Sequence, residues 1–158
     1  RYEKHPTDNE VLFDLAMSYA YSGQILEGWL TLKKLPKSYA PVVISKYEQL
    51  IEESPAMWQY HFKCAFGYFF QGRKQDAIDS FHKVIAIDDQ QVWAYGFIAL
   101  VYGEMGNVDE AISYCKKGLE IEPNATGIHF LLGEGYRKKK KYMKFLKQML
   151  KVGKLQAK

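Results

Sequence analysis

Two side chains near the middle of the chain have the spacing of metal ligands. His61 and Cys64 stand three positions apart, so on a helix they share one face about one turn apart. Imidazole nitrogen and thiolate sulfur both bind zinc, but a structural zinc site takes four such ligands. The neighbouring sequence supplies no second pair, so we expect no metal to bind here.

The remaining reactive groups do not combine into a catalytic centre. Cys64 and Cys115 fall at apolar helical positions, where cysteine acts as a small hydrophobic residue in a reducing compartment. Asn124-Ala125-Thr126 matches a glycosylation acceptor, yet it stands in a predicted tight turn of a chain without secretory context. There is no phosphate-cradling glycine loop, nucleophile motif or dense cluster of His, Asp and Glu. We therefore expect a protein that is not an enzyme and needs no cofactor.

The charges of the chain are segregated. Residues 1–136 hold 12 Lys and Arg against 18 Asp and Glu, whereas residues 137–158 hold 10 Lys and Arg and no acid. The basic segment opens with Arg137, Lys138, Lys139, Lys140 and Lys141, which are candidate contacts for a polyanion. The commoner role of such a run is a solvated surface that keeps the end of a fold soluble.

The ends and the hydropathy of the chain indicate its setting. No run of about 18 apolar residues is present, so no membrane span is predicted. The first residues, RYEKHPTDNE, contain neither an initiator methionine nor a signal-peptide pattern. We expect a cytoplasmic protein and treat the sequence as a fragment.

The elements that must position these residues recur along the chain. Tyr68, Tyr102 and Tyr136 are spaced by 34 residues, and a small residue precedes each of them by three positions. Gly72 and Gly106 follow the first two tyrosines, where a turn between helices needs a permissive backbone. This period indicates pairs of helices that bury their apolar stripes against one another.

The pattern resembles the tetratricopeptide repeat (TPR) family. From 92 to 125 the family's residue types are matched by Ala99, Tyr102, Gly106, Ala111, Cys115 and Pro123, with Cys115 in place of an aromatic residue. The preceding repeat has Ala65, Tyr68, Gly72, Ala77 and Phe81, with Asp89 in place of proline. The resemblance implies an all-α fold, a right-handed superhelical TPR solenoid of about nine helices.

We expect a single TPR domain over residues 1–158. Regular repeats are predicted at about 58–91, 92–125 and 126–158. The first unit, about 8–56, contains an extra helix at 42–53, and either of its last two helices can take the usual place of a second helix. In the last repeat Lys140 replaces the turn glycine and Phe145 the small alanine, as is typical of a terminal repeat.

A second apolar stripe runs along the helix predicted at 57–71, about 130° from the face that packs within the repeat. In the TPR architecture this stripe lines a concave groove. The predicted groove residues are Phe13, Met17, Tyr21, Phe62, Phe66, Phe69, Phe70, Trp93, Leu100 and Phe130. Gly96 and Gly103 indicate a local dent in the groove that fits one large side chain.

Two occupants of this groove remain open, namely a partner's apolar peptide or helix and the chain's own helix at 42–53. Some TPR proteins bind acidic chaperone C-termini through a polar clamp, and its positions here are Phe13, Met17, Phe66, Gly96 and Leu100. The clamp is therefore absent.

We predict a non-enzymatic interaction module (a scaffold, adaptor or chaperone-like protein) with a protein or peptide partner, or with self-association through the groove. The alternative is a basic-tailed adaptor that docks on nucleic acid or an anionic membrane through its C-terminal helix.

Overall fold

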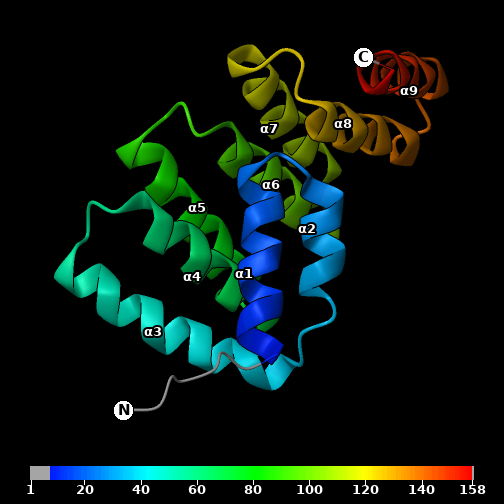
Figure 1. Cartoon of the computed structure of the whole chain (residues 1–158). Coiled ribbons are helices and arrows are strands. Elements are labelled where there is room, and N and C mark those ends of the chain that lie inside the picture. The colour runs from blue at the N-terminus through cyan, green and yellow to red at the C-terminus, as the bar shows by residue number, and fades with distance from the viewer. Residues whose placement is uncertain (1–7, 158) are drawn as a thin grey trace.

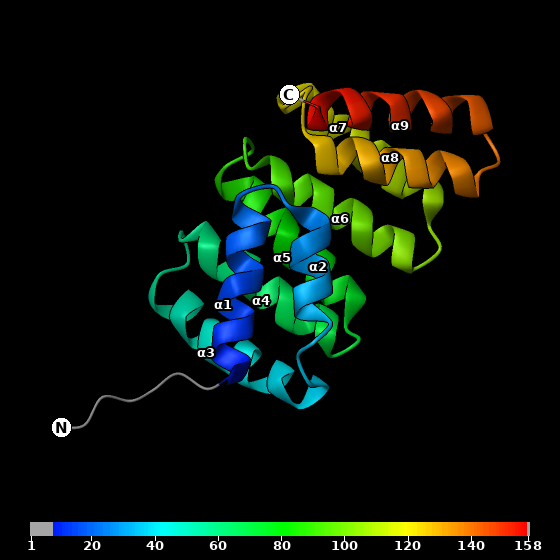
Figure 2. The ribbon, with the colours of Figure 1, turned by 45° about the vertical axis from the view of Figure 1, so that its right-hand side comes forward.

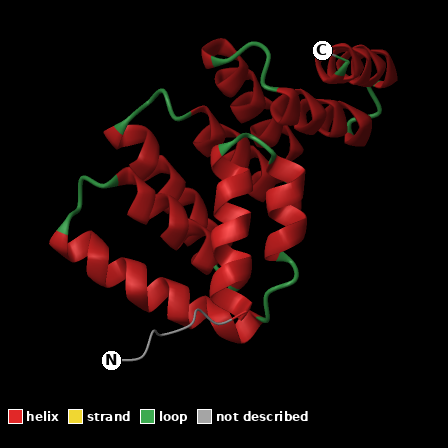
Figure 3. Cartoon of the chain, in the orientation of Figure 1, coloured by secondary structure: helices red, strands yellow, loops and turns green. Residues whose placement is uncertain are grey.

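The computed structural model describes residues 8–157, and helices make up most of this part (Figure 3). The expected all-α fold is confirmed. In chain order the elements are α1 (Asp8–Tyr21), α2 (Ile25–Leu32), the 3-10 helix η1 (Lys37–Tyr39), α3 (Ala40–Glu53), α4 (Trp58–Phe70), α5 (Lys74–Ile87), α6 (Val92–Glu104), α7 (Val108–Ile121), α8 (Thr126–Lys138) and α9 (Tyr142–Gln156). None of the described helices is both long and apolar enough to cross a membrane.

Helix α2 ends at Leu32, because the amides of Lys34 and Leu35 bond in tight turns before Pro36. Helix α9 is the longest described helix and runs to Gln156.

One turn geometry closes all four helical hairpins. Gly23, Gly72 and Gly106 each adopt a φ of +83°, which costs a glycine little because it has no Cβ. The next amide along the chain then donates to the carbonyl of a tyrosine five residues back. These bonds run from Gln24 to Tyr19, Arg73 to Tyr68, Asn107 to Tyr102 and Lys141 to Tyr136, at 2.8–2.9 Å. Lys140 takes the glycine position in the last turn with a φ of 60°.

Three hairpins, α4–α5, α6–α7 and α8–α9, stack in a row (Figure 1). Within the row, α5 packs on α6 and α7 packs on α8, so the second helix of each hairpin contacts the first helix of the next. Helix α3 packs on α4 in the same way. Of the two helices that could fill the place of a second helix in the first unit, α3 therefore fills it.

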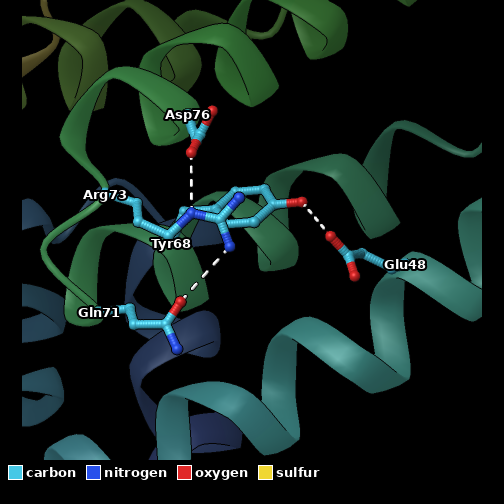
Figure 4. Close-up of polar contacts among 5 residues, drawn as sticks. All are labelled: Glu48, Tyr68, Gln71, Arg73 and Asp76. Atoms are coloured by element: carbon cyan, nitrogen blue, oxygen red, sulfur yellow. Dashed lines mark hydrogen bonds and ion pairs between the residues drawn. The ribbon is translucent and has the colours of Figure 1, made fainter.

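Polar contacts fasten α3 to the first hairpin of the row (Figure 4). The hydroxyl of Tyr68 on α4 donates to a carboxylate oxygen of Glu48 on α3 at 2.5 Å. The guanidinium of Arg73 lies 4.5 Å from the centre of the Tyr68 ring and pairs with Asp76 at 2.8 Å. Tyr68, which the period singled out, therefore links α3, α4 and the start of α5.

A second polar contact recurs with the period at the turns that lead into α4, α6 and α8. His61 Nε2 lies 2.8 Å from the carbonyl oxygen of Pro55, and His129 Nε2 lies 2.6 Å from that of Pro123. Midway between these histidines, the hydroxyl of Tyr95 donates to the carbonyl of Asp89 at 3.2 Å. Each side chain bonds a carbonyl six residues back, so His61 fastens an interhairpin turn.

The α1–α2 hairpin does not join the row. Figures 1 and 2 show α1 and α2 side by side across the helices of the row. Helix α2 contacts α6 and α8, which are first helices of their hairpins. We call the side of the row formed by α4, α6 and α8 the inner face, and the α1–α2 hairpin lies on this face.

Candidate protein-binding surfaces

Seven of the ten predicted groove residues lie on α4, α6 and α8, the helices that form the inner face, whereas Phe13, Met17 and Tyr21 lie on α1. Five of the ten are buried. Phe62 is 1% exposed and Phe66 is 2% exposed, and Phe13, Met17 and Leu100 are also buried. The side chains of Phe69, Phe70, Trp93 and Phe130 are half-buried, and Tyr21 is exposed. Inside the row, Phe66 packs edge-on against Phe81 and Phe97, with ring centres 5.4 and 4.9 Å apart.

Aromatic side chains of the α1–α2 hairpin cover this surface. The ring centre of Tyr21 lies 5.4 Å from that of Phe62 and 5.9 Å from that of Trp58. At the other end, Trp29 packs edge-on against Phe69 with ring centres 4.6 Å apart. Edge-on aromatic pairs of this kind add stability beyond the area that they bury.

Glycines let the hairpin approach the inner face closely. A Cβ atom at Gly96 of α6 would lie 3.0 Å from Cδ1 of Ile25, and one at Gly127 of α8 would lie 3.2 Å from the same atom. A Cβ at Gly23 would lie 2.2 Å from Cζ2 of Trp93. Of the two glycines at which a dent is predicted, Gly96 is filled by Ile25 of the same chain, whereas a Cβ at Gly103 would meet no atom within 4 Å.

The helix expected at 42–53 is not the element that covers the inner face. It forms the main part of α3, which packs on α4 at the start of the row. It reaches the hairpin through Tyr47, whose ring centre lies 6.3 Å from that of Phe13. The sequence did not point to Ile25 and Gly127. Their contact joins α2 to α8, and no repeat spacing in the sequence relates these two helices.

Part of the inner face stays open beside α2. Leu26 and Trp29 form one wall, Leu100 and Gly103 of α6 a second, and Leu131 and Glu134 of α8 a third. We call this hollow of about 200 Å³ the inner cleft. Leu26 is 39% exposed, and Leu30, one turn further along α2, is 59% exposed. A Cβ at Gly103 would meet no atom within 4 Å, so the cleft has room at that position.

The charged rim of the inner cleft contains both signs. Glu104, Glu134 and Lys138 stand at its edge. Glu134 is paired with Arg137 at 2.7 Å, whereas the side chain of Glu104 faces solvent. The cleft is therefore an apolar hollow with a polar border, which is the usual composition of a ligand-binding hollow.

The basic run predicted as a polyanion contact spans the end of α8 and the following turn. Arg137 pairs with Glu134, and Lys139 pairs with Asp109 of α7 at 2.9 Å. Lys138, Lys140 and Lys141 are exposed. Two of the five cations thus already neutralise acids of the chain, and contact with a polyanion stays a prediction.

Burial keeps the two thiols protonated. Cys64 and Cys115 are each 1% exposed, and burial raises the pKa of Cys64 to about 11 and that of Cys115 to about 12. The Nε2 atom of His61, the candidate metal ligand paired with Cys64, is bonded to the carbonyl oxygen of Pro55, so this side chain fastens the turn that leads into α4. Residues 8–157 contain no group of three or more His, Cys, Asp and Glu side chains arranged to hold a metal.

The tyrosine hydroxyls near the α1–α2 hairpin are also held neutral. Burial, with smaller contributions from Asp14 and Tyr39, raises the pKa of Tyr47 to about 12. Burial likewise raises the pKa of Tyr21. Both hydroxyls therefore stay protonated well above neutral pH.

Comparisons with known proteins agree with this architecture. A family model described as the tetratricopeptide repeat matches residues 92–125. A comparison with curated proteins finds no match. Solved structures do match. A crystal structure of the MamA protein has a TM-score of 0.69 and 21% identity, over 94% of this chain and 92% of that one.

Two further structures extend the comparison. A MamA structure from Desulfovibrio magneticus RS-1 has a TM-score of 0.66 and 15% identity, over 95% of this chain and 76% of that one. The second TPR of Spaghetti (RPAP3), bound to the HSP90 peptide SRMEEVD, has a TM-score of 0.59 and 18% identity, over 68% of this chain and 98% of that one. Residues 92–125 are a tetratricopeptide repeat, and the chain has the all-α fold of a tetratricopeptide-repeat solenoid.

Proposed function

We propose that this chain is a non-enzymatic protein-interaction module that binds an apolar peptide or helix in the inner cleft. The observation that carries the proposal is the open hollow between α2, α6 and α8. Its walls are leucine and tryptophan side chains, and the exposed Leu26 and Leu30 extend them to the surface. Exposed apolar residues beside a hollow are typical of an interaction site.

The size of the cleft favours a narrow ligand. A hollow of about 200 Å³ accommodates one or two large side chains, and Gly103 leaves free space in its wall. An amphipathic helix or an extended peptide presents side chains in this way, and its backbone then follows the polar rim. The similar RPAP3 repeat, which is bound to the HSP90 peptide SRMEEVD, supports a peptide partner as a class, without regard to its composition.

The predicted groove residues differ in how directly a partner can contact them. Leu100 lines the open cleft and is a direct contact for a ligand. Phe62 and Phe66 become accessible to a partner only when the α1–α2 hairpin leaves the inner face, because its side chains cover them. We therefore assign the first contacts to the cleft and not to the phenylalanine stripe.

A selection from a displayed library of short peptides tests the proposal. Peptides selected on the wild-type chain would be labelled, and their affinities measured for two variants, Gly103→Leu and Gly153→Leu. Both glycines are helical and open, with no atom within 4 Å of an added Cβ. Both changes are therefore compatible with folding, but only Gly103→Leu fills the cleft.

We expect Gly103→Leu to weaken binding at least about tenfold and Gly153→Leu to leave it unchanged. The loss should appear without a fall in melting temperature, since leucine is a better helix former than glycine. Selected peptides that bind both variants equally, or a library that yields no binder, would contradict the proposal.

A further inference from the structure

The last helix of the row carries an apolar strip that nothing in the described chain covers. Met143 is 80% exposed, Leu146 is 51% exposed and Leu150 is 69% exposed. They follow the i, i+3, i+7 spacing of one helix face. We call these three residues the α9 strip. No residue of α9 is fully buried.

Part of the α9 strip corresponds to a stacking surface elsewhere in the row. One period before Leu146 stands Ile112, whose Cγ1 atom would lie 2.7 Å from a Cβ at Gly135 of the next hairpin. Another period back stands Ile78, which is 1% exposed. At this position α7 packs against the following helix and the α5 side chain is buried, so Leu146 continues a surface that the molecule already covers in both earlier hairpins.

The strip is also wider than that interface requires. Met143 corresponds to Gln75 in α5 and Asp109 in α7, and both of those polar side chains are exposed. Likewise Leu150 corresponds to His82 in α5 and Lys116 in α7. If this face of α9 contacted only solvent, these positions would be expected to stay polar. Their change to methionine and leucine indicates a surface that a further element covers.

The charges beside the α9 strip indicate which charge the covering element must carry. Lys147, Lys151 and Lys154 recur at i, i+4, i+7 along one edge of the strip, and all three are exposed. Residues 137–158 contain no acid to neutralise them. In the preceding hairpin the acid at the position of Met143, Asp109, pairs with Lys139. Because α9 offers only cations, a complementary partner must bring the acids.

We propose that the α9 strip docks an acidic amphipathic helix of a partner protein, which packs on α9 as α8 packs on α7. The apolar face of the partner helix covers Met143, Leu146 and Leu150. Its carboxylates lie along the lysine edge formed by Lys147, Lys151 and Lys154. Two copies of α9 do not suit each other, since their lysine edges repel at close range.

A designed peptide can serve as the probe. It is a labelled peptide about four helical turns long, with Leu and Ala at i, i+3, i+4, i+7 and Glu at the outer positions. The comparison peptide carries Lys in place of every Glu. Binding is measured by fluorescence polarisation against the wild-type chain and the double variant Met143→Glu with Leu150→Glu.

We expect the acidic peptide to bind the wild-type chain, and the double variant to weaken that binding at least about tenfold. Rising salt should weaken binding too, and the lysine peptide should not bind. The matched control is Val42→Glu on α3, which also adds a carboxylate at an exposed apolar residue, 53% exposed, and should bind as the wild type does. Gly103→Leu, which fills the inner cleft, should likewise leave this binding intact, so the two surfaces are tested separately.

Three outcomes would overturn the proposal. The first is that the acidic peptide binds the double variant as tightly as the wild-type chain, or that the lysine peptide binds as tightly as the acidic one. The second is cosedimentation with phosphatidylserine vesicles that the double variant abolishes while the acidic peptide fails to bind, which would assign the strip to a membrane. The third is a concentration-dependent dimer in sedimentation equilibrium that the double variant dissociates, which would assign the strip to a second copy of the chain.

Discussion

Ile25 of α2 lies against Gly96 of α6, with its Cδ1 atom 3.0 Å from the position that a Cβ would take on Gly96. A Cβ at Gly127 of α8 would lie 3.2 Å from the same Ile25 atom. One isoleucine thus fits between glycines of two successive hairpins and holds α2 on the inner face. The absence of side chains at these glycines is what makes that close approach available.

A larger side chain at Gly96 should displace the hairpin. We expect Gly96→Leu to lower the free energy of unfolding by about 1–3 kcal/mol through overpacking against Ile25. Trp29 and Trp93, which lie at the hairpin contacts, should become more exposed, as a red shift of tryptophan fluorescence would report. Gly103→Leu is the matched control, since an added Cβ there meets nothing. Equal stability of the two variants would contradict this account of α2.

Phe66 should contribute to stability in the isolated chain. It is 2% exposed and contacts the rings of Phe62, Phe81 and Phe97. We expect Phe66→Ala to cost about 3–5 kcal/mol in urea denaturation. Phe66→Glu should lower helicity as well, because it buries a carboxylate without a partner. Leu30→Ala, at a 59% exposed position, should change stability by less than about 0.5 kcal/mol.

The bond from His61 to the Pro55 carbonyl should be replaceable by a tyrosine hydroxyl. Tyr95 makes the corresponding bond one period later. We expect His61→Ala to cost about 1–3 kcal/mol, because it removes packing and leaves the carbonyl unpaired. His61→Tyr should restore at least half of that loss. Equal melting temperatures of the two variants would show that the bond is not what stabilises this turn.

Lys140 is the one non-glycine residue with a positive φ in the described part of the chain. Side chains with a Cβ are strained in this region by about 1–2 kcal/mol. We therefore expect Lys140→Gly to raise the free energy of unfolding by about 0.5–1 kcal/mol, measured by chemical denaturation. Lys141→Gly, in the next position, lacks this benefit and serves as the control. A destabilised Lys140→Gly variant would argue that the lysine side chain itself supports the turn.

Alkaline pH should destabilise the fold. The pKa of Cys64 is raised to about 11, and those of Cys115 and Tyr47 to about 12. A group with a raised folded-state pKa keeps its full contribution below its unfolded-state pKa and loses it as pH rises through the folded-state value. Unfolding would therefore release protons above about pH 9, where an unfolded thiol ionises.

We expect the urea midpoint to be level between about pH 7 and 8 and to fall between about pH 9 and 12. Tyr47→Phe, which cannot ionise, should show a shallower fall. A midpoint that rises with pH, or that stays level up to pH 11, would contradict the assigned burial of these groups.

Much of the fold could be predicted because it depends on local spacing. The recurrence of Tyr68, Tyr102 and Tyr136 located three hairpins, and in a stacked repeat each hairpin contacts only its neighbours. The turn glycines Gly72 and Gly106 and their lysine counterpart at 140 were assigned from the same spacing. The extra helix near residues 42–53 followed from its own apolar periodicity.

The candidate surfaces could be predicted only in part. The stripe that contains Phe62 and Phe66 could be assigned to one face of one helix, because its residues recur at helical spacing within α4. Its exposure could not be predicted, since an apolar face has the same sequence whether a partner or the chain itself covers it. The role of His61 could not be predicted for a similar reason. Its hydrogen-bond partner is the carbonyl of Pro55, and a backbone group leaves no signal in the sequence.

By itself the sequence determined the three regular hairpins, their turns and their order of stacking, because these depend on residues within one period of each other. Only the tertiary structure decided that α3 and not α2 packs on α4, that the α1–α2 hairpin lies on the inner face, that Ile25 packs against Gly96, and that a cleft beside Leu100 stays open. Those contacts join α2 to α6 and α8 across tens of intervening residues. Whether such surfaces meet depends on the path of the chain through residues 33–39, which no periodicity specifies.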